Sequence, residues 1–131
     1  MKRLFKSTKQ KTARQLRGQA SEALAVGHLK SQGYVILETN VRYPIGEIDI
    51  IAKEADTLCF VEVRSTATDV FGGPLATITS AKRLRIIRAA RWYLAYQKDP
   101  PAFVRFDVLG ILWTDPSHPQ IELIRGAFDA S

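Results

Sequence analysis

Two acidic side chains, Asp49 and Glu62, lie in neighbouring apolar runs of this 131-residue chain. A short polar stretch, residues 54–57, separates the runs, and their content of Ile, Val and Phe predicts a β-hairpin. If Lys53 faces Leu58 across this turn, Asp49 lies directly opposite Glu62, with Cβ atoms about 4.5–5.5 Å apart. Two carboxylates that face each other need a shared proton or a cation. The sequence therefore predicts a metal site or a group of basic partners at this point.

The same register assigns the hairpin side chains to two faces. The face of the two acids also carries Ile51, Phe60 and Arg64, whereas the second face is wholly apolar and consists of Ile48, Ile50, Cys59, Val61 and Val63. Apolar residues on both faces predict a central hairpin that is covered on both sides. The alternative to a metal is a structural ion cluster, because Glu47 faces Arg64 in this register. The register alone leaves both interpretations open.

Length and composition limit the class of protein. A chain of 131 residues predicts one domain with a core large enough to fold without staples. The single cysteine, Cys59, excludes an internal disulfide and suits a reducing compartment. No apolar run approaches the roughly 20 residues of a membrane span, and the basic N-terminus lacks the apolar segment of a signal peptide. We therefore expect a cytoplasmic protein with no membrane partner.

Positive charge is concentrated at the N-terminus. Residues 1–17 hold seven Lys or Arg residues and no acid, which accounts for all of the formal net charge of +6. We predict a disordered basic tail over residues 1–17, followed by a single domain over residues 18–131. The tail either contacts nucleic acid or only aids solubility. The tail residues expected to contact nucleic acid are Lys9, Lys11, Arg14 and Arg17.

The rest of the pattern predicts two helices and five strands. Apolar residues at spacings of three and four predict helices over 18–32 and 80–98, the first ending at Gly33 and the second capped by Ser80. Runs rich in branched and aromatic residues predict strands over 34–41, 46–53, 58–65, 103–113 and 120–125. The order αβββαββ predicts an α/β (α+β) sandwich with a mixed sheet.

The second helix is unusually basic. Five cations and no acid lie between Ser80 and Tyr96, which predicts contact with phosphates more than simple solvation. These cations are Lys82, Arg83, Arg85, Arg88 and Arg91. Trp92, Tyr93 and Tyr96 lie near the end of this helix, and we expect their rings to pack in the core.

Three short stretches together resemble a known family. They are the helix residue Glu22, the run Gly46-Glu47-Ile48-Asp49, and the run Phe60-Val61-Glu62-Val63-Arg64. This constellation resembles the YraN-like family of small bacterial proteins. That family is similar to the archaeal-type Holliday junction resolvases of the PD-(D/E)XK, restriction-endonuclease-like superfamily. The resemblance covers residues 18–128 and implies a restriction-endonuclease-like sandwich, with a central mixed five-stranded sheet flanked by helices.

The resemblance also implies a site that binds Mg²⁺ or Mn²⁺. By position, Asp49, Glu62 and the Val63 carbonyl would be metal ligands. Glu22 matches the helix acid that completes the catalytic site, although an acid near a helix start also interacts favourably with the helix dipole. The family's usual catalytic Lys is Arg64 here. Arg stays protonated and cannot act as a general base, but it can hold a phosphate.

Lys82 has two interpretations. It supplies an amine to the site if it points there, and otherwise it belongs to the basic face of the second helix, which we expect. Three functions follow from these residues: a metal-dependent endonuclease for structured or branched DNA, a non-catalytic nucleic-acid-binding module with the same fold, and a scaffold with an ion cluster. Arg64 favours the second function, the three acids favour the first, and the basic segments oppose the third. The resolvases act as dimers, but the sequence shows no interface for a homodimer.

Overall fold

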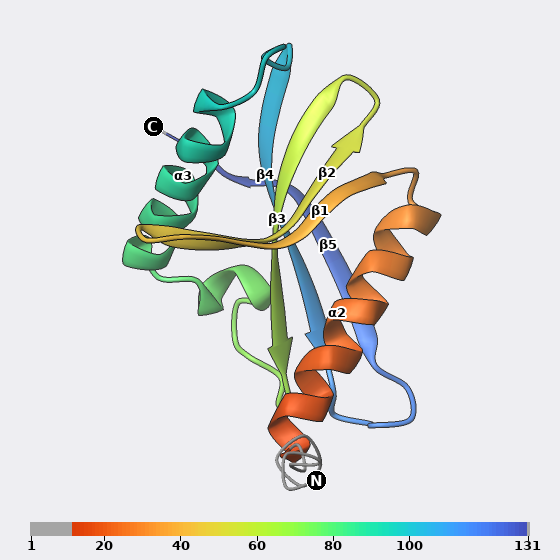
Figure 1. The fold of residues 1–131 in the computed structure, drawn as a ribbon. Coiled ribbons are helices and arrows are strands. Elements are labelled where there is room, and N and C mark those ends of the chain that lie inside the picture. Colours follow the sequence, from red (N-terminus) through yellow and green to blue (C-terminus); the bar gives the residue numbers. More distant parts are fainter. Residues whose placement is uncertain (1–11, 131) are drawn as a thin grey trace, which may run out of the picture.

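A computed structural model describes residues 12–130 (Figure 1). The elements follow in the order α2 (Ala13–Ser31), β1 (Val35–Tyr43), β2 (Gly46–Glu54), β3 (Thr57–Thr66), the short 3-10 helix η1 (Pro74–Thr77), α3 (Ser80–Ala95), β4 (Phe103–Leu112) and β5 (Gln120–Phe128). The predicted order and the α+β class are confirmed. No helix within the described residues is long and apolar enough to cross a membrane.

The five strands form one mixed sheet in the order β1-β2-β3-β4-β5. The β3–β4 pair is parallel and is joined through η1 and α3, whereas the other three pairs are antiparallel. Helix α2 covers one face of the sheet and α3 covers the other (Figure 1). Each face therefore has its own core, and the central strands are apolar on both sides, as predicted.

The two cores differ in the size of their side chains. The core under α3 is rich in aromatic rings, and Phe60, Phe106 and Phe128 stack in sequence across three strands. The core under α2 consists of smaller side chains, among them Ala25, Leu29, Ile50, Val61 and Leu109. Strand β3 contributes side chains to both cores, so the middle of this strand, where Glu62 lies, is covered on both faces.

The predicted hairpin register is correct. Lys53 pairs with Leu58 and Ile50 pairs with Val61. Glu54 also pairs with Thr57, so the turn contains only residues 55 and 56. Ala55 has φ of 54°, the left-handed conformation that a tight turn requires. The ladder ends at the Ile50–Val61 pair, so Asp49 and Glu62 are the first residues beyond it on the two strands and do not form a ladder pair.

Strand β2 leaves β3 after the Ile50–Val61 pair and continues with β1 towards α3 (Figure 1). We call this separation of the two strands the fork. On β1, Asn40 has φ of 54° and interrupts the pairing opposite Asp49. As a result, Ile48 packs in the core under α3 and Ile50 in the core under α2. The expectation that these two residues share a face is wrong, because it assumed an uninterrupted strand.

Helix α2 begins earlier than predicted. Thr12 is its N-cap: the Thr12 hydroxyl accepts from the Gln15 amide, and the Gln15 side chain accepts from the Thr12 amide. This capping box brings residues 13–17, which were predicted to belong to the tail, into the helix. Lys9 and Lys11 lie outside the described residues. At the other end Gly33 has φ of 94°, so the predicted stop is correct.

Helix α3 begins at Ser80, as predicted, but its capping residue and its C-terminal end differ from the prediction. Its N-cap is Thr79 and not Ser80, because the Thr79 hydroxyl accepts from the Lys82 amide at 3.1 Å. The helix ends at Ala95, before the Asp-Pro-Pro stretch that was expected to stop it. The cap matters for function because it places Lys82 in the first turn of α3, next to the sheet.

A buried ionic network holds the hairpin end of the sheet. The Asp107 carboxylate is fully buried and accepts hydrogen bonds from the Tyr34 hydroxyl at 2.7 Å, Arg105 Nε at 2.8 Å and the Gly126 amide at 3.0 Å. Arg105 also contacts Glu54 at 2.6 Å. The network therefore ties β2, β4, β5 and the residue before β1 together, and it satisfies the buried charge.

Candidate functional site

Asp49 lies at the fork. Its Oδ2 accepts a hydrogen bond from the Val63 backbone amide at 2.9 Å. Beyond Val61, β3 no longer has β2 as its ladder partner, so the Asp49 side chain replaces a backbone acceptor. The amide and carbonyl of one strand residue point to the same side of the strand. The Val63 carbonyl therefore faces the gap that Asp49 occupies.

Glu62 is the buried acid of the site. The residue is only 3% exposed, and this burial is the main cause that raises the pKa of its carboxyl to about 8. The negative charge of the nearby Asp49 raises the pKa further. Asp49 is therefore close enough to Glu62 to influence its ionisation.

Two cations contact the same oxygen of Glu62. Lys82 Nζ lies 3.7 Å from Glu62 Oε2, and Arg64 Nη1 lies 3.6 Å from it. Both cations act to lower the pKa of Glu62, but burial and Asp49 outweigh them. Lys82 thus points into the site. The expectation that it belongs to the outer basic face is wrong, because the long Lys82 side chain reaches the Glu62 carboxylate from the first turn of α3.

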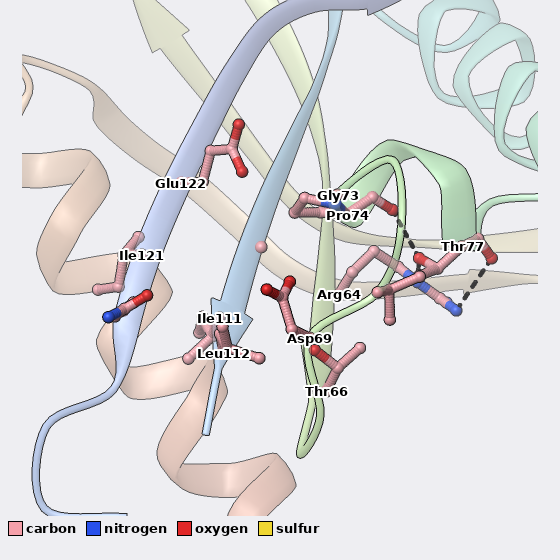
Figure 2. A pocket seen from close by; sticks show the side chains of 13 residues that line it. Arg64, Thr66, Asp69, Gly73, Pro74, Thr77, Ile111, Leu112, Ile121 and Glu122 are labelled. Atoms are coloured by element: carbon pink, nitrogen blue, oxygen red, sulfur yellow. Dashed lines mark hydrogen bonds between the residues drawn. The ribbon is translucent and has the colours of Figure 1, made fainter. Parts of the chain in front are cut away.

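Arg64 is fixed by η1. Its Nε donates to the Thr77 hydroxyl at 2.9 Å and its Nη2 donates to the Thr77 carbonyl at 3.3 Å (Figure 2). The Thr77 hydroxyl in turn donates to the Pro74 carbonyl at 2.6 Å. This chain of hydrogen bonds holds the guanidinium at the edge of the site, where it is able to bind an anion. Arg64, which stands where the resemblance would place a Lys, is therefore held by Thr77.

Glu22 lies across a cleft from β3. Its Oε1 accepts a hydrogen bond from Asn40 Nδ2 at 2.6 Å. The cleft has a volume of about 230 Å³, and its lining residues are Gly18, Ser21, Glu22, Asn40, Asp49, Val63 and Ser65. Because α2 begins at Ala13, Glu22 is in the interior of the helix, and the explanation by a first-turn dipole is wrong. The structure brings Glu22 and Asp49 to one cleft.

Helix α2 is anchored beside this cleft by a buried serine. The Ser21 hydroxyl donates to Ser65 Oγ at 2.9 Å and accepts from Trp113 Nε1 at 2.9 Å. Ser21 is 2% exposed, so these bonds satisfy a polar group that is shielded from water. The anchor sets the position of the next residue, Glu22. Nothing in the local pattern around Ser21 indicates this role, because both of its partners lie far along the chain.

A second cavity of about 230 Å³ is lined by Arg64 together with residues of the loop before η1, of β4 and of β5. Figure 2 shows the carboxylates of Asp69 and Glu122 on its walls, with Thr77 near Arg64. Pro74 packs directly against Gly110, and a Cβ atom at Gly110 would overlap the proline ring. The close approach of this loop to β4 therefore requires glycine, and it supports the turn that carries Thr77.

Glu47 is not part of the site. It forms an ion pair with Arg42 at 3.7 Å, and both side chains are largely exposed. Because β2 leaves β3 at the fork, Glu47 does not face Arg64. The ion cluster considered from the sequence therefore has a different membership, with Glu62 at its centre.

The donor groups suit a hard divalent cation. Two carboxylates and a backbone carbonyl are oxygen ligands of the kind that Mg²⁺ uses together with water and substrate phosphates. Among residues 12–130, however, no group of three or more His, Cys, Asp or Glu residues is gathered for metal binding. Glu22 instead engages Asn40. Asp49, Glu62 and the Val63 carbonyl are thus the oxygen groups that would hold an ion here, without a third acid.

The cations of α3 divide into three groups. Lys82 belongs to the site, and the Arg83 guanidinium lies 5.6 Å from the centre of the Phe128 ring, at the edge of the core. Arg91 is exposed and reaches the Ala130 carbonyl at 3.5 Å. Arg85 and Arg88 are exposed. Fewer than the five predicted cations are therefore exposed for contact with a phosphate backbone.

The aromatic residues of α3 also divide. Tyr93 is buried in the core, as predicted, but Trp92 is 39% exposed and Tyr96 is 75% exposed. The prediction that all three pack in the core is wrong for these two. Helical spacing could have shown this, because Trp92 and Tyr96 follow Arg88 at intervals of four and share its solvent-facing side.

These features define a class of small α+β proteins with a five-stranded mixed sheet and two paired carboxylates where two central strands separate. The model of the "Uncharacterised protein family UPF0102" matches residues 21–111. A UPF0102 protein of Desulfosudis oleivorans is 47% identical over 118 residues, covering 90% of this chain and 94% of the relative. UPF0102 proteins of Geotalea daltonii (46% over 112 residues; 86% and 88% covered) and Nitrosomonas europaea (46% over 116 residues; 88% and 95% covered) are also similar.

The chain belongs to UPF0102, which is the YraN-like family that the sequence resembles. The resemblance was carried by the residues around Glu22, Asp49 and Glu62. All three lie within the matched range, as do Arg64 and Lys82.

Proposed function

We propose that this protein is a cytoplasmic, metal-dependent endonuclease that hydrolyses phosphodiester bonds in structured or branched DNA. The observation that carries the proposal is the buried Glu62, placed against Asp49 and within 4 Å of Lys82 and Arg64. Burial and a neighbouring acid disfavour the ionised form of Glu62. A carboxylate whose role is to stabilise the fold would instead have its ionised form favoured by its surroundings. Perturbed acids of this kind are concentrated at functional sites.

The proposed chemistry assigns a role to each residue. Asp49, Glu62 and the Val63 carbonyl would hold Mg²⁺ or Mn²⁺, which when bound polarises a phosphate and activates water. Arg64, fixed by Thr77, binds a phosphate oxygen and stabilises the charge that develops on it. Glu22 holds Asn40 and so supports the residue opposite Asp49.

Lys82 takes the part that the triplet Lys has in the superfamily. Arg64 stays protonated and cannot accept a proton from water. Lys82 brings an amine to 3.7 Å from the carboxylate that Arg64 also contacts. We assign Lys82 to proton transfer and to phosphate binding at the reacting centre, which leaves Arg64 as an electrostatic group only.

The decisive experiment is a cleavage screen over linear, single-stranded, flapped and four-way DNA with Mg²⁺ or Mn²⁺. The wild type should cleave at least one branched substrate, and Lys82→Met should lose cleavage while it retains DNA binding. Adding Arg64→Lys to Lys82→Met tests whether an amine at the triplet position restores the reaction. Glu47→Gln is the matched control, because Glu47 is a strand carboxylate outside the site.

Metal binding is tested separately by thermal unfolding. Asp49→Asn removes a charge that opposes Glu62, so the metal-free variant should be as stable as the wild type or more stable. The same variant should lose the stabilisation that Mn²⁺ gives the wild type, because a ligand that binds only the folded state raises stability. A strongly destabilised variant, with a wild type indifferent to metal, would contradict the metal site.

A second function has an observation in its favour. Arg64 already contacts Thr77 and Glu62, and no third acidic ligand joins the pair among the described residues. A protein that binds DNA without cutting it would retain these features. If no substrate is cleaved while binding persists in the wild type and in Lys82→Met, the non-catalytic binding module replaces the endonuclease.

A further inference from the structure

We propose that Tyr43, Trp92 and Tyr96 form a base-stacking platform for a single-stranded segment of nucleic acid. The Tyr43 and Trp92 rings are stacked, with centroids 5.5 Å apart and planes at 29°. Trp92 and Tyr96 follow at 6.4 Å and 38°. The platform thus joins the end of β1 to the last turn of α3. It rests on the proposed function for the class of partner, and it specifies which part of the substrate is bound.

Two of the three rings, Trp92 and Tyr96, are exposed, whereas Tyr43 is partly buried against the core under α3. Trp92 is 39% exposed and Tyr96 is 75% exposed, while the adjacent Tyr93 packs in the core. Large apolar rings that gather on a surface mark contact sites more often than rings that occur singly. Nucleobases stack on such rings whatever their identity, because every base has a π-face.

The charges beside the platform favour nucleic acid over an apolar partner. Arg88 precedes Trp92 by four residues and Arg85 precedes Arg88 by three, so both exposed cations lie on the same side of α3 as the rings. Glu38 is the carboxylate that lies close to the platform tyrosine Tyr43 and to Tyr93, and burial and then the charge of Glu38 raise the pKa of both hydroxyls. Rings for bases and adjacent guanidinium groups for phosphates are the two components of a single-strand site.

The partner must be single-stranded because a duplex hides its base faces. Helix α3 leads from Lys82 at the site to Tyr96 on the platform, a length of about 20 Å at 1.5 Å per residue. A strand that lies along α3 would therefore reach the site from the platform. The unpaired arm of a branched DNA has the required chemistry, and its capture would place the branch near Glu62.

The test is a binding measurement with the full-length protein in EDTA, which prevents any metal-dependent cleavage. The probes are a labelled ten-residue oligothymidylate and a duplex of the same length. Tyr96→Ala and Trp92→Ala should each weaken oligothymidylate binding by at least about fivefold, the lower end of the effect of removing a stacked ring. Tyr96→Phe and Trp92→Phe should bind like the wild type, and duplex affinity should change much less.

Two further variants separate stacking from charge and from folding. Tyr96→Lys replaces the ring by a cation. If the ring carries the binding, this variant should bind oligothymidylate as weakly as Tyr96→Ala does. The oligonucleotide should quench tryptophan fluorescence in Trp113→Phe, which keeps Trp92, but not in Trp92→Phe. Tyr96 is largely exposed, so its variants test the platform even if Trp92→Ala fails to fold.

Several results would overturn the platform. These are an unchanged affinity in Tyr96→Ala, full binding by Tyr96→Lys, or a change of oligomeric state in Tyr96→Ala, which would make the rings a protein interface. Normal cleavage and duplex binding with no loss of single-strand affinity would overturn the platform alone. Single-strand binding that depends on the rings, in a protein that never cleaves, would instead contradict the endonuclease and leave the platform in place.

Discussion

At the scale of single residues, the raised pKa of Glu62 should make the stability of the metal-free fold depend on pH. Its pKa of about 8 lies above the ordinary value of 4.5, so the folded protein binds this proton more tightly than the unfolded chain does. The protonated form stabilises the fold fully below pH 4.5, and this contribution is lost as the pH rises through about 8. Each pH unit of difference corresponds to about 1.4 kcal/mol, which sets an upper limit of a few kcal/mol.

We therefore expect metal-free Glu62→Gln to match the wild type near pH 4.5 and to exceed its free energy of unfolding by about 1–3 kcal/mol at pH 8. The neutral amide avoids the desolvation of a charge, and Lys82 and Arg64 remain partly exposed to water. Denaturant unfolding at several pH values measures the difference. Glu47→Gln, an exposed carboxylate, should show no such dependence. A variant less stable than the wild type at pH 8 would show that Glu62 serves as an anion for its cations.

That Asp49 lies near Glu62 could be predicted from sequence, because the register around one turn brings the two strands together up to the Ile50–Val61 pair. The position of Lys82 could not be predicted. It depends on how α3 packs on the sheet, which lets Lys82 in its first turn reach Glu62 on β3. Periodicity assigns a residue to a side of its own helix, but it does not say which neighbouring element that side meets.

At the scale of elements, the Ser21 anchor connects α2 to the site. We predict that Ser21→Ala lowers the free energy of unfolding by about 1–3 kcal/mol, because it leaves Trp113 Nε1 without its acceptor. It should also weaken metal-dependent cleavage through a shift of Glu22. The matched control is Ser31→Ala, since Ser31 is an exposed serine of the same helix that bonds only to the His28 carbonyl. Equal stability of the two variants would refute the anchor.

The fork is the element that sequence patterns could not reveal. Strict alternation placed Ile48 with Ile50, but the left-handed Asn40 and the departure of β2 reverse the face at Asp49. Such an interruption depends on how α3 holds the β1–β2 end. At Gly46 a Cβ atom would overlap the Arg85 carbonyl, so the end of the hairpin lies directly against α3. That contact is between segments far apart in sequence.

At the scale of the whole molecule, the N-terminal cations should set the salt dependence of DNA binding. The natural deletion is residues 1–11, which holds five Lys or Arg residues and leaves the Thr12 cap in place. For every phosphate that the shortened protein no longer binds, the log–log slope of affinity against salt should fall by about 0.9 on duplex DNA. Changing those five residues to Gln at full length is the control for chain length. An unchanged slope would assign the tail to solubility.

The overall architecture was predictable because most strands are short apolar runs between clear turns. The order of helices and strands is then compatible with only a few layered architectures. The predicted strands 34–41, 46–53 and 58–65 agree with β1, β2 and β3 except for one or two residues at their ends. Helix α2 was harder to place. Its capping box uses Thr12 and Gln15 within a stretch whose charge pattern suggests a tail, and local hydrogen bonds there outweigh composition.

The Asp107 network has a consequence for how reliably the chain finds its fold. A parallel pair such as β3–β4 can slip along its length, since apolar side chains tolerate exchange with one another. A slipped β4 would move Asp107 and Arg105 together, so the carboxylate would keep its Arg105 partner but lose the Tyr34 hydroxyl and the Gly126 amide. A buried polar group that loses hydrogen-bond partners costs about 1–3 kcal/mol. The Asp107 network therefore favours the observed alignment of β3 and β4 over a slipped one.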